Sequence, residues 1–117
     1  MYKYLILLLI PFDALANNED YHNNIYCSKE KGIKEFILEN KVRVDCLTKD
    51  YAIEMDWCNK WYEGITQALY YAMLTNNKAK LVLIKNSSND NKYINRALQT
   101  IRFYNLPITL EVIKVIQ

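Results

Sequence analysis

The chain has 117 residues, with 15 basic and 13 acidic side chains and a formal net charge of +2. This length suffices for one domain with one hydrophobic core. The charge excludes the strongly basic balance that by itself indicates a nucleic-acid-binding protein, so any such contact must come from local clustering.

Residues 1–16, MYKYLILLLIPFDALA, have the pattern of a secretory signal peptide. One basic residue, Lys3, precedes an apolar run over residues 5–10, and a small-x-small sequence ends the stretch at residues 14–16. The apolar run is shorter than the roughly 20 residues that span a bilayer. We expect cleavage before Asn17, no stable membrane insertion after cleavage, and a periplasmic or secreted protein.

The first part of the mature chain is predicted to be a flexible segment followed by strands. Residues 17–25 are polar and indicate flexibility, so the only histidine, His22, is expected to be solvated. A helical turn is expected over about residues 26–32, at the start of a domain covering residues 26–117. Three segments then predict an antiparallel meander: KEFIL (34–38), VRVDCLT (42–48) and YAIEMDW (51–57).

The second part is predicted to alternate helices and strands. Apolar residues recur at helical spacing within residues 60–77 and indicate an amphipathic helix. KLVLIK (80–85) is typical of a buried strand, residues 89–104 predict a second amphipathic helix, and ITLEVIKVI (108–116) predicts a last strand. The predicted fold class is α/β (α+β), with order βββαβαβ around a mixed central sheet of four to five strands.

Three cysteines, Cys27, Cys46 and Cys58, indicate one disulfide and one odd thiol in an oxidising compartment. We predict the Cys27–Cys46 pair, because Cys27 precedes the first strand and Cys46 points to the face opposite Asp45, where the early segment can cover it. Cys27–Cys58 is the alternative pair. The absence of a CxxC motif argues against a zinc site.

The strands at 42–48 and 51–57 carry acidic residues at facing positions. If Thr48 faces Tyr51 across the turn, Asp45 lies opposite Glu54 on the same face. Opposed side chains have Cβ atoms about 4.5–5.5 Å apart, and like charges so placed repel by about 4 kcal/mol at 4 Å in an effective dielectric of 20. A Mg²⁺ or Mn²⁺ ion would compensate this repulsion, so we predict that Asp45 and Glu54 hold such a metal, with Asp56 as a third ligand.

A solvated polar face is the alternative interpretation of these acids. The same register places Arg43 opposite Asp56. That pair would be an ordinary exposed ion pair, worth about 0.2–1 kcal/mol.

The helix predicted at 60–77 carries polar residues on one side. Lys60, Glu63, Gln67 and Tyr71 recur at spacings of three or four. Lys60 and Gln67 can reach the carboxylates from there, and this set of groups suits metal-assisted cleavage of a phosphodiester, with the lysine stabilising developing negative charge. Pairing of Lys60 with Asp56 or Glu63 in solvent is the alternative.

Four short motifs follow one another along the chain: Asp45, EMD (54–56), KWYE (60–63) and QALYY (67–71). Together they resemble the PD-(D/E)XK nuclease superfamily, which has the restriction-endonuclease-like fold. They also resemble small uncharacterised bacterial and phage proteins with the pattern E…RVDCLT…YAIExD…KWxEAIxQxLYY. The resemblance covers about residues 27–84.

The resemblance assigns roles to single residues. Glu35 corresponds to the acid of the first core element, Asp45 and Glu54 to the metal-binding acids, and Gln67 to the glutamine of the following helix. The superfamily usually carries the first acid on a helix, whereas Glu35 is predicted on a strand. Asp56 stands where the motif has lysine, so the lysine is expected to be Lys60, on the neighbouring helix.

These patterns predict an exported Mg²⁺- or Mn²⁺-dependent nuclease acting on DNA. A non-catalytic module that binds nucleic acid or a protein partner on the same fold is the alternative, and an exported domain with a solvated acidic face is a third interpretation. The choice between DNA and RNA, and the formation of a homodimer, stay open.

Overall fold

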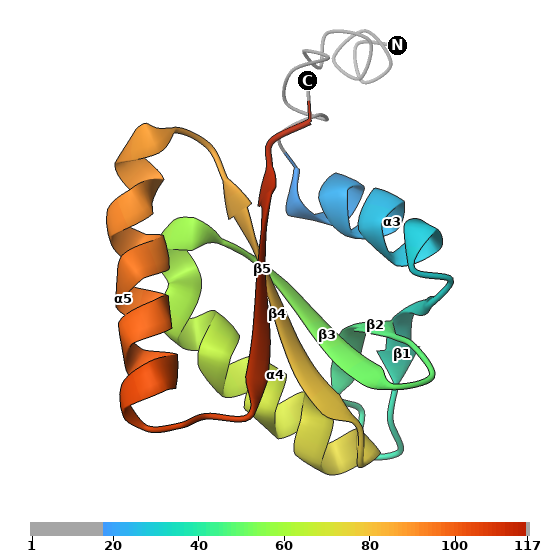
Figure 1. Ribbon diagram of the computed structural model, residues 1–117. Coiled ribbons are helices and arrows are strands. Elements are labelled where there is room, and N and C mark those ends of the chain that lie inside the picture. The colour runs from blue at the N-terminus through green and yellow to red at the C-terminus, as the bar shows by residue number, and fades with distance from the viewer. Residues whose placement is uncertain (1–17, 117) are drawn as a thin grey trace, which may run out of the picture.

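Residues 18–116 are the part of the chain that the computed structural model describes. They form a five-stranded mixed sheet with helices on both faces (Figure 1). The predicted signal peptide lies outside the described residues. The elements follow in the order α3 (Glu19–Lys29), β1 (Ile33–Ile37), β2 (Arg43–Leu47), β3 (Tyr51–Trp57), η1 (Cys58–Lys60), α4 (Trp61–Thr75), β4 (Lys78–Lys85), η2 (Ser88–Asp90), α5 (Asn91–Phe103) and β5 (Ile108–Lys114). The predicted α+β class and the order βββαβαβ are confirmed, with a further helix before the first strand.

The strands lie in the sheet in their sequence order, β1-β2-β3-β4-β5. Short turns join β1 to β2 and β2 to β3, so these pairs are antiparallel, whereas α4 and α5 form the crossovers that make β3, β4 and β5 parallel. The arrangement is compatible with the restriction-endonuclease-like fold that the resemblance implied. The carboxyl ends of β3, β4 and β5 therefore share one edge of the sheet.

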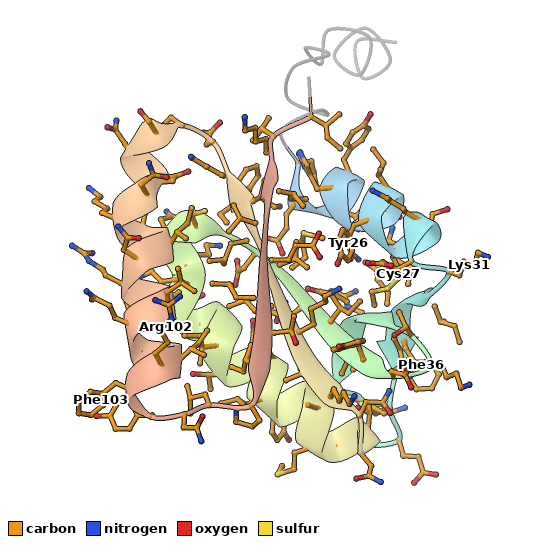
Figure 2. All side chains as sticks on the ribbon, viewed as in Figure 1. Tyr26, Cys27, Lys31, Phe36, Arg102 and Phe103 are labelled. Atoms are coloured by element: carbon orange, nitrogen blue, oxygen red, sulfur yellow. A yellow bond between two sulfur atoms is a disulfide. The ribbon has the colours of Figure 1, made fainter. Side chains whose placement is uncertain are left out.

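The segment expected to be flexible, residues 17–25, is described from residue 18, and it is instead largely helical from Glu19, where α3 begins. Asn18 caps this helix: its Oδ1 accepts a hydrogen bond from the backbone N–H of Asp20 at 2.7 Å. Tyr26 and Cys27 bury one side of α3 against the sheet, and Figure 2 shows both on that side. The polar composition concealed this helix, since few of its residues are apolar.

His22 is fully buried, which corrects the expectation of a solvated histidine. Its Nδ1 donates to the carbonyl of Asn18 at 2.8 Å, and its Nε2 accepts from the backbone N–H of Ile116 at 3.0 Å. One neutral tautomer satisfies both bonds. His22 thereby ties α3 to the residues that follow β5.

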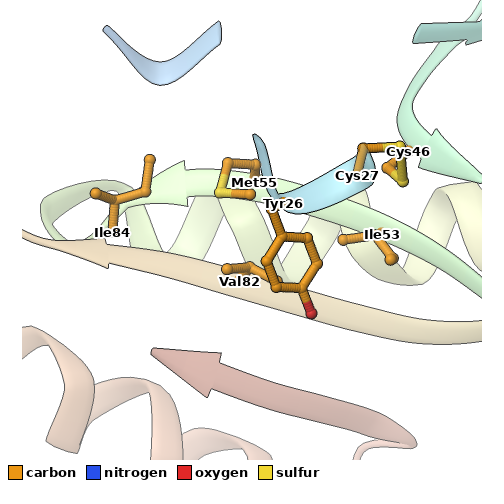
Figure 3. Close-up of a cluster of buried hydrophobic side chains, with 7 residues drawn as sticks. All are labelled: Tyr26, Cys27, Cys46, Ile53, Met55, Val82 and Ile84. Carbon is orange, nitrogen blue, oxygen red and sulfur yellow. A yellow bond between two sulfur atoms is a disulfide. The ribbon is translucent and has the colours of Figure 1, made fainter. Parts of the chain in front are cut away.

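Each face of the sheet has its own buried cluster. The cluster under α3 is shown in Figure 3 and consists of Tyr26, Cys27, Cys46, Ile53, Met55, Val82 and Ile84. The cluster under α4 and α5 consists of Cys58, Ile65, Ala68, Ala79, Leu81, Leu83 and Ala97. Strand β4, which lies between β3 and β5, supplies residues to both clusters, and this explains the continuous apolar run that predicted a buried strand.

The predicted Cys27–Cys46 disulfide is confirmed and joins α3 to β2, with a Cα–Cα distance of 5.7 Å. Cys58 is free and buried, so the alternative pair does not form. Gly32 makes room for the bridge: a Cβ atom at this position would collide with Cys46 Sγ and lie 2.9 Å from Cys27 Sγ. Chain reversal between α3 and β1 beside the disulfide therefore requires glycine.

Reduction of this disulfide should destabilise the protein. In the chain-entropy model, a loop closed over a sequence separation of 19 contributes about 3 kcal/mol to the free energy of unfolding. Urea unfolding with and without reductant measures the loss. A Cys27→Ala/Cys46→Ala variant is the control, and its unfolding midpoint in urea should be the same with and without reductant. If reductant leaves the unfolding midpoint of the unaltered protein unchanged, the expectation is wrong.

Candidate active site

The hairpin of β2 and β3 positions the first acid. Its register is the predicted one, with Cys46 opposite Ile53 and Leu47 opposite Ala52, but the paired positions end there. At the next position, Oδ2 of Asp45 accepts a hydrogen bond from the backbone N–H of Met55 at 2.9 Å. A side-chain oxygen thus takes the place of the backbone carbonyl that would accept this bond in a regular ladder. This bond fixes the Asp45 carboxylate against β3.

Two further carboxylates, Glu54 and Asp56, alternate along β3 and are only 3% and 5% exposed. Burying such groups is unfavourable unless they are paired or hydrogen-bonded. Asp56 Oδ1 accepts from the backbone N–H of Trp57 at 3.1 Å. Glu54 Oε2, by contrast, is buried and has no hydrogen-bond partner among the described residues.

Helix α4 approaches these acids closely because of Gly64. A Cβ atom there would lie 2.7 Å from Leu81 Cδ1 and 3.6 Å from the Cβ of Asp56. A larger residue would require the Leu81 side chain or the helix itself to shift. The close approach places Lys60, just before α4, and Gln67, within it, at the same cavity as the acids.

This cavity, which we call the acidic cavity, has a volume of about 560 Å³. It is lined by Glu19, Val42, Arg43, Asp45, Glu54, Asp56, Lys60, Glu63, Gln67, Tyr70 and Tyr71. Five of the predicted site residues therefore come together: Asp45, Glu54, Asp56, Lys60 and Gln67.

Glu35 is the predicted site residue that does not line the acidic cavity. It lies half-buried in β1 with a φ of 52°, a left-handed conformation within an edge strand. The structure thus gives no support to its proposed role as the acid of the first core element.

Glu19, the first residue of α3, lines the cavity in its place and was missed by the sequence analysis. One turn further along the helix, Asn23 donates a hydrogen bond from Nδ2 to the carbonyl oxygen of Asp45 at 2.9 Å, which anchors α3 beside β2. The capping sequence of Asn18 followed by two acids was the available signal for this helix and its acidic first turn.

The acids of the cavity raise one another's pKa values. Burial, followed by a hydrogen bond with the Asp45 carboxylate and by the charge of Asp45, raises the pKa of Glu54 to about 11. Burial also raises the pKa of Asp56 to about 6, although Lys60 opposes this shift. Burial and the charges of Asp56 and Asp45 raise the pKa of Glu19 to about 7. The cluster therefore lacks enough nearby positive charge to hold all its acids ionised.

None of the three ion pairs considered from the sequence forms. The salt bridges found within residues 18–116 all lie outside the acidic cavity. Arg43 and Asp56 line the same cavity without a salt bridge, and Lys60 makes none to Asp56 or Glu63. Because Glu54 and Asp56 are also buried, the acids do not form a solvated face.

The donor atoms suit a hard divalent cation. Mg²⁺ is usually held by one or two carboxylates and completes its coordination with water and phosphate oxygens. The unpaired Glu54 Oε2, beside the fixed carboxylate of Asp45, provides such a donor pair. Within residues 18–116 no three His, Cys, Asp or Glu side chains are already arranged as a metal-binding group.

Comparison of the chain with protein-family models, curated proteins and solved structures found no match. No helix between residues 18 and 116 is long and apolar enough to cross a membrane. The chemistry of the acidic cavity is therefore the basis for assigning a function.

The substitution Glu54→Gln should stabilise the metal-free protein at pH 7. Because the pKa of Glu54 is raised from its ordinary 4.5 in the folded state, folding requires a proton at neutral pH, so stability is highest below the unfolded-state pKa and falls as the pH rises. The gain is at most about 3 kcal/mol at pH 7, the free energy of neutralising an ordinary carboxylate there. It should vanish near pH 4.

Urea unfolding of both proteins at the two pH values measures this difference. Glu63→Gln is the matched control, since Glu63 lines the same cavity but is exposed, and its effect should be small at both pH values. Equal stability of Glu54→Gln and the unaltered protein at pH 7 would show that Glu54 is not strained by burial.

Proposed function

We propose that the protein is a metal-dependent nuclease that hydrolyses phosphodiester bonds of DNA, in the periplasm or outside the cell. The observation that carries the proposal is the unpartnered Oε2 of buried Glu54 in a cavity that also holds Asp45, Asp56 and Lys60. An acidic cavity with one unpaired carboxylate oxygen and a lysine at its border matches the requirements of metal-assisted phosphodiester cleavage.

Asp45 and Glu54 are the proposed metal ligands. A bound Mg²⁺ or Mn²⁺ would supply Lewis-acid polarisation of the phosphate and a more acidic water. Asp45 is already oriented by its bond to the Met55 N–H, so it loses little freedom on binding. Asp56 and Glu19 stand next to this pair and become more fully ionised when positive charge enters the cavity.

Lys60 and Gln67 are proposed to act on the substrate side of the cavity. Lys60 is exposed and makes no salt bridge within the described residues, so its ammonium group is available to a phosphate. It would stabilise the negative charge that develops on the phosphate oxygens. Gln67, on the exposed side of α4, can donate its amide N–H to the same phosphate or to water.

A non-catalytic binding module is the second candidate. Asp56 occupies the position where the superfamily motif has lysine, and its carboxylate cannot supply positive charge. Without a lysine at that position, the same fold would bind nucleic acid or a protein partner without cleaving it. Incubation of the purified protein with plasmid, with and without Mg²⁺ or Mn²⁺, separates the two candidates, because only the nuclease nicks or linearises the plasmid.

Divalent metal should raise the melting temperature of the protein. A ligand that binds only the folded state stabilises it, by about 2.7 kcal/mol at a concentration of 100 times the dissociation constant. Asp45→Ala should abolish the rise, whereas Lys60→Ala should keep it, and thermal unfolding with and without Mn²⁺ measures both. If calorimetry detects no binding of a divalent ion at millimolar concentrations, the metal site is wrong.

Lys60→Ala should lose plasmid cleavage while keeping the metal-dependent rise in melting temperature. Removal of one donor to a developing oxyanion lowers the rate by roughly 100- to 1000-fold. Lys29→Ala is the matched control, since Lys29 is exposed in the last turn of α3, and it should cleave normally. Cleavage by Lys60→Ala at the unaltered rate would show that another group performs this role.

A further inference from the structure

Two lysines lie side by side at the edge of the sheet where the parallel strands end. Lys85 is the last residue of β4, and Lys114, the last residue of β5, is its register partner. The pairing is fixed by the backbone, because the N–H of Val115 donates to the carbonyl of Lys85 at 3.0 Å. Like charges at directly opposed positions are destabilising, so this placement is not explained by stability.

The lysine pair opens on a cavity of its own, which we call the lysine cavity. It has a volume of about 330 Å³ and is lined by Lys85, Asn86, Ser87, Ser88, Lys114 and Val115. No acidic side chain lines it, and neither lysine takes part in a salt bridge within residues 18–116. Two ammonium groups, two hydroxyls and an amide are all hydrogen-bond donors, a set that suits an anion with several oxygen acceptors.

A third cavity, which we call the connecting cavity, shares one lining residue with the lysine cavity and one with the acidic cavity. It has a volume of about 460 Å³ and shares Lys60 with the acidic cavity and Asn86 with the lysine cavity. The three cavities therefore follow one another past the carboxyl ends of β3, β4 and β5, which lie at the same edge of the sheet.

The connecting cavity contains groups of both signs. Its acidic residue, Asp90, directs Oδ2 to the backbone N–H of Asn86 at 2.7 Å. Two aromatic residues, Trp57 and Tyr93, also line it. Lys92 Nζ and the guanidinium carbon of Arg96 lie 5.0 and 5.6 Å from the centre of the Tyr93 ring. An aromatic ring flanked by cations is a surface on which a base and its phosphate can both be accommodated.

We propose that Lys85 and Lys114 form a second phosphate subsite, which binds the backbone of a polynucleotide strand whose scissile phosphodiester lies at Asp45 and Glu54. This inference rests on the proposed nuclease function and makes it more specific, because it assigns the lysine cavity to the part of the strand that lies beyond the scissile phosphodiester. A mononucleotide would occupy the acidic cavity alone and would gain nothing from the lysine pair.

Binding of a fluorescent 20-nucleotide DNA single strand, measured by anisotropy in EDTA at several salt concentrations, tests the subsite without cleavage. The Lys85→Gln/Lys114→Gln variant should bind the strand with an affinity that is lower by roughly tenfold or more at low salt, because it lacks two charges that neutralise phosphates. Each lysine that neutralises a phosphate contributes about 0.7 to the slope of log affinity against log salt for a single strand. The slope of the double variant should therefore be shallower by about 1.4.

Lys29→Gln/Lys49→Gln is the matched control. It removes the same number of charges from exposed positions that line none of the three cavities, so its affinity and slope should stay close to those of the unaltered protein. Lys114→Gln alone, at an exposed position, should show about half the change in slope. This single variant keeps the test valid if the double variant is poorly folded.

Equal loss of affinity in the control pair would overturn the subsite, since the binding would then depend on overall charge. If the unaltered protein does not bind the strand at low salt, the subsite is overturned as well. The same holds if the protein binds inorganic phosphate but not the strand. An unaltered protein that binds through the lysine pair but never cleaves with Mn²⁺ would leave the subsite standing and refute the nuclease. If the lysine substitutions change neither cleavage nor binding, the nuclease stands and the subsite is refuted.

Discussion

The burial of carboxylates on the central strand β3 is the constraint on which the rest of this structure depends. Glu54 and Asp56 are almost completely covered, and Asp45 is held beside them by a backbone N–H. A buried acid without a partner destabilises a fold. A domain of this size tolerates such a group only if the elements around it are held firmly by other contacts.

Those contacts hold α3 and α4 on opposite faces of β3. On one face, α3 is fixed at two points: the Cys27–Cys46 disulfide joins it to β2, and the backbone N–H of Ile116, after β5, donates to His22 Nε2. On the other face, Gly64 lets α4 lie close to β3 and β4. The acidic cavity is therefore formed by rigid elements, which is the condition for a binding site to keep its geometry.

The direction of the strands separates charges of opposite sign along one edge of the sheet. The parallel strands β3, β4 and β5 all end there, and their last residues and the loops after them carry different groups. Acids gather where β3 meets α4, and the lysine pair lies where β4 and β5 end. In contrast, the exposed aromatic side chain of Phe103 lies at the carboxyl end of α5 (Figure 2) and lines none of the three cavities. The net charge of +2 conceals this division, because it sums 15 basic and 13 acidic side chains over the whole chain.

The sequence by itself determined the strands, the two main helices and the hairpin register, and it favoured the Cys27–Cys46 disulfide over the Cys27–Cys58 alternative. These features depend on local patterns: alternation along a strand, helical periodicity, and a turn between Thr48 and Tyr51 that fixes which residues face each other. Because the register is fixed locally, the placement of Asp45 near Glu54 also followed from the sequence. Lys60 and Gln67 came to the same cavity because α4 begins directly after β3.

Only the tertiary structure decided which acid completes the cavity. Glu19 reaches it and Glu35 does not, because the position of α3 depends on contacts with β2 and with residue 116, which are far away in the sequence. The same distant contacts turned a polar segment into a helix with a buried histidine. The lysine pair likewise joins residues 29 positions apart, Lys85 and Lys114. Local patterns specify elements, whereas the side chains that meet at a cavity are chosen by the packing of those elements.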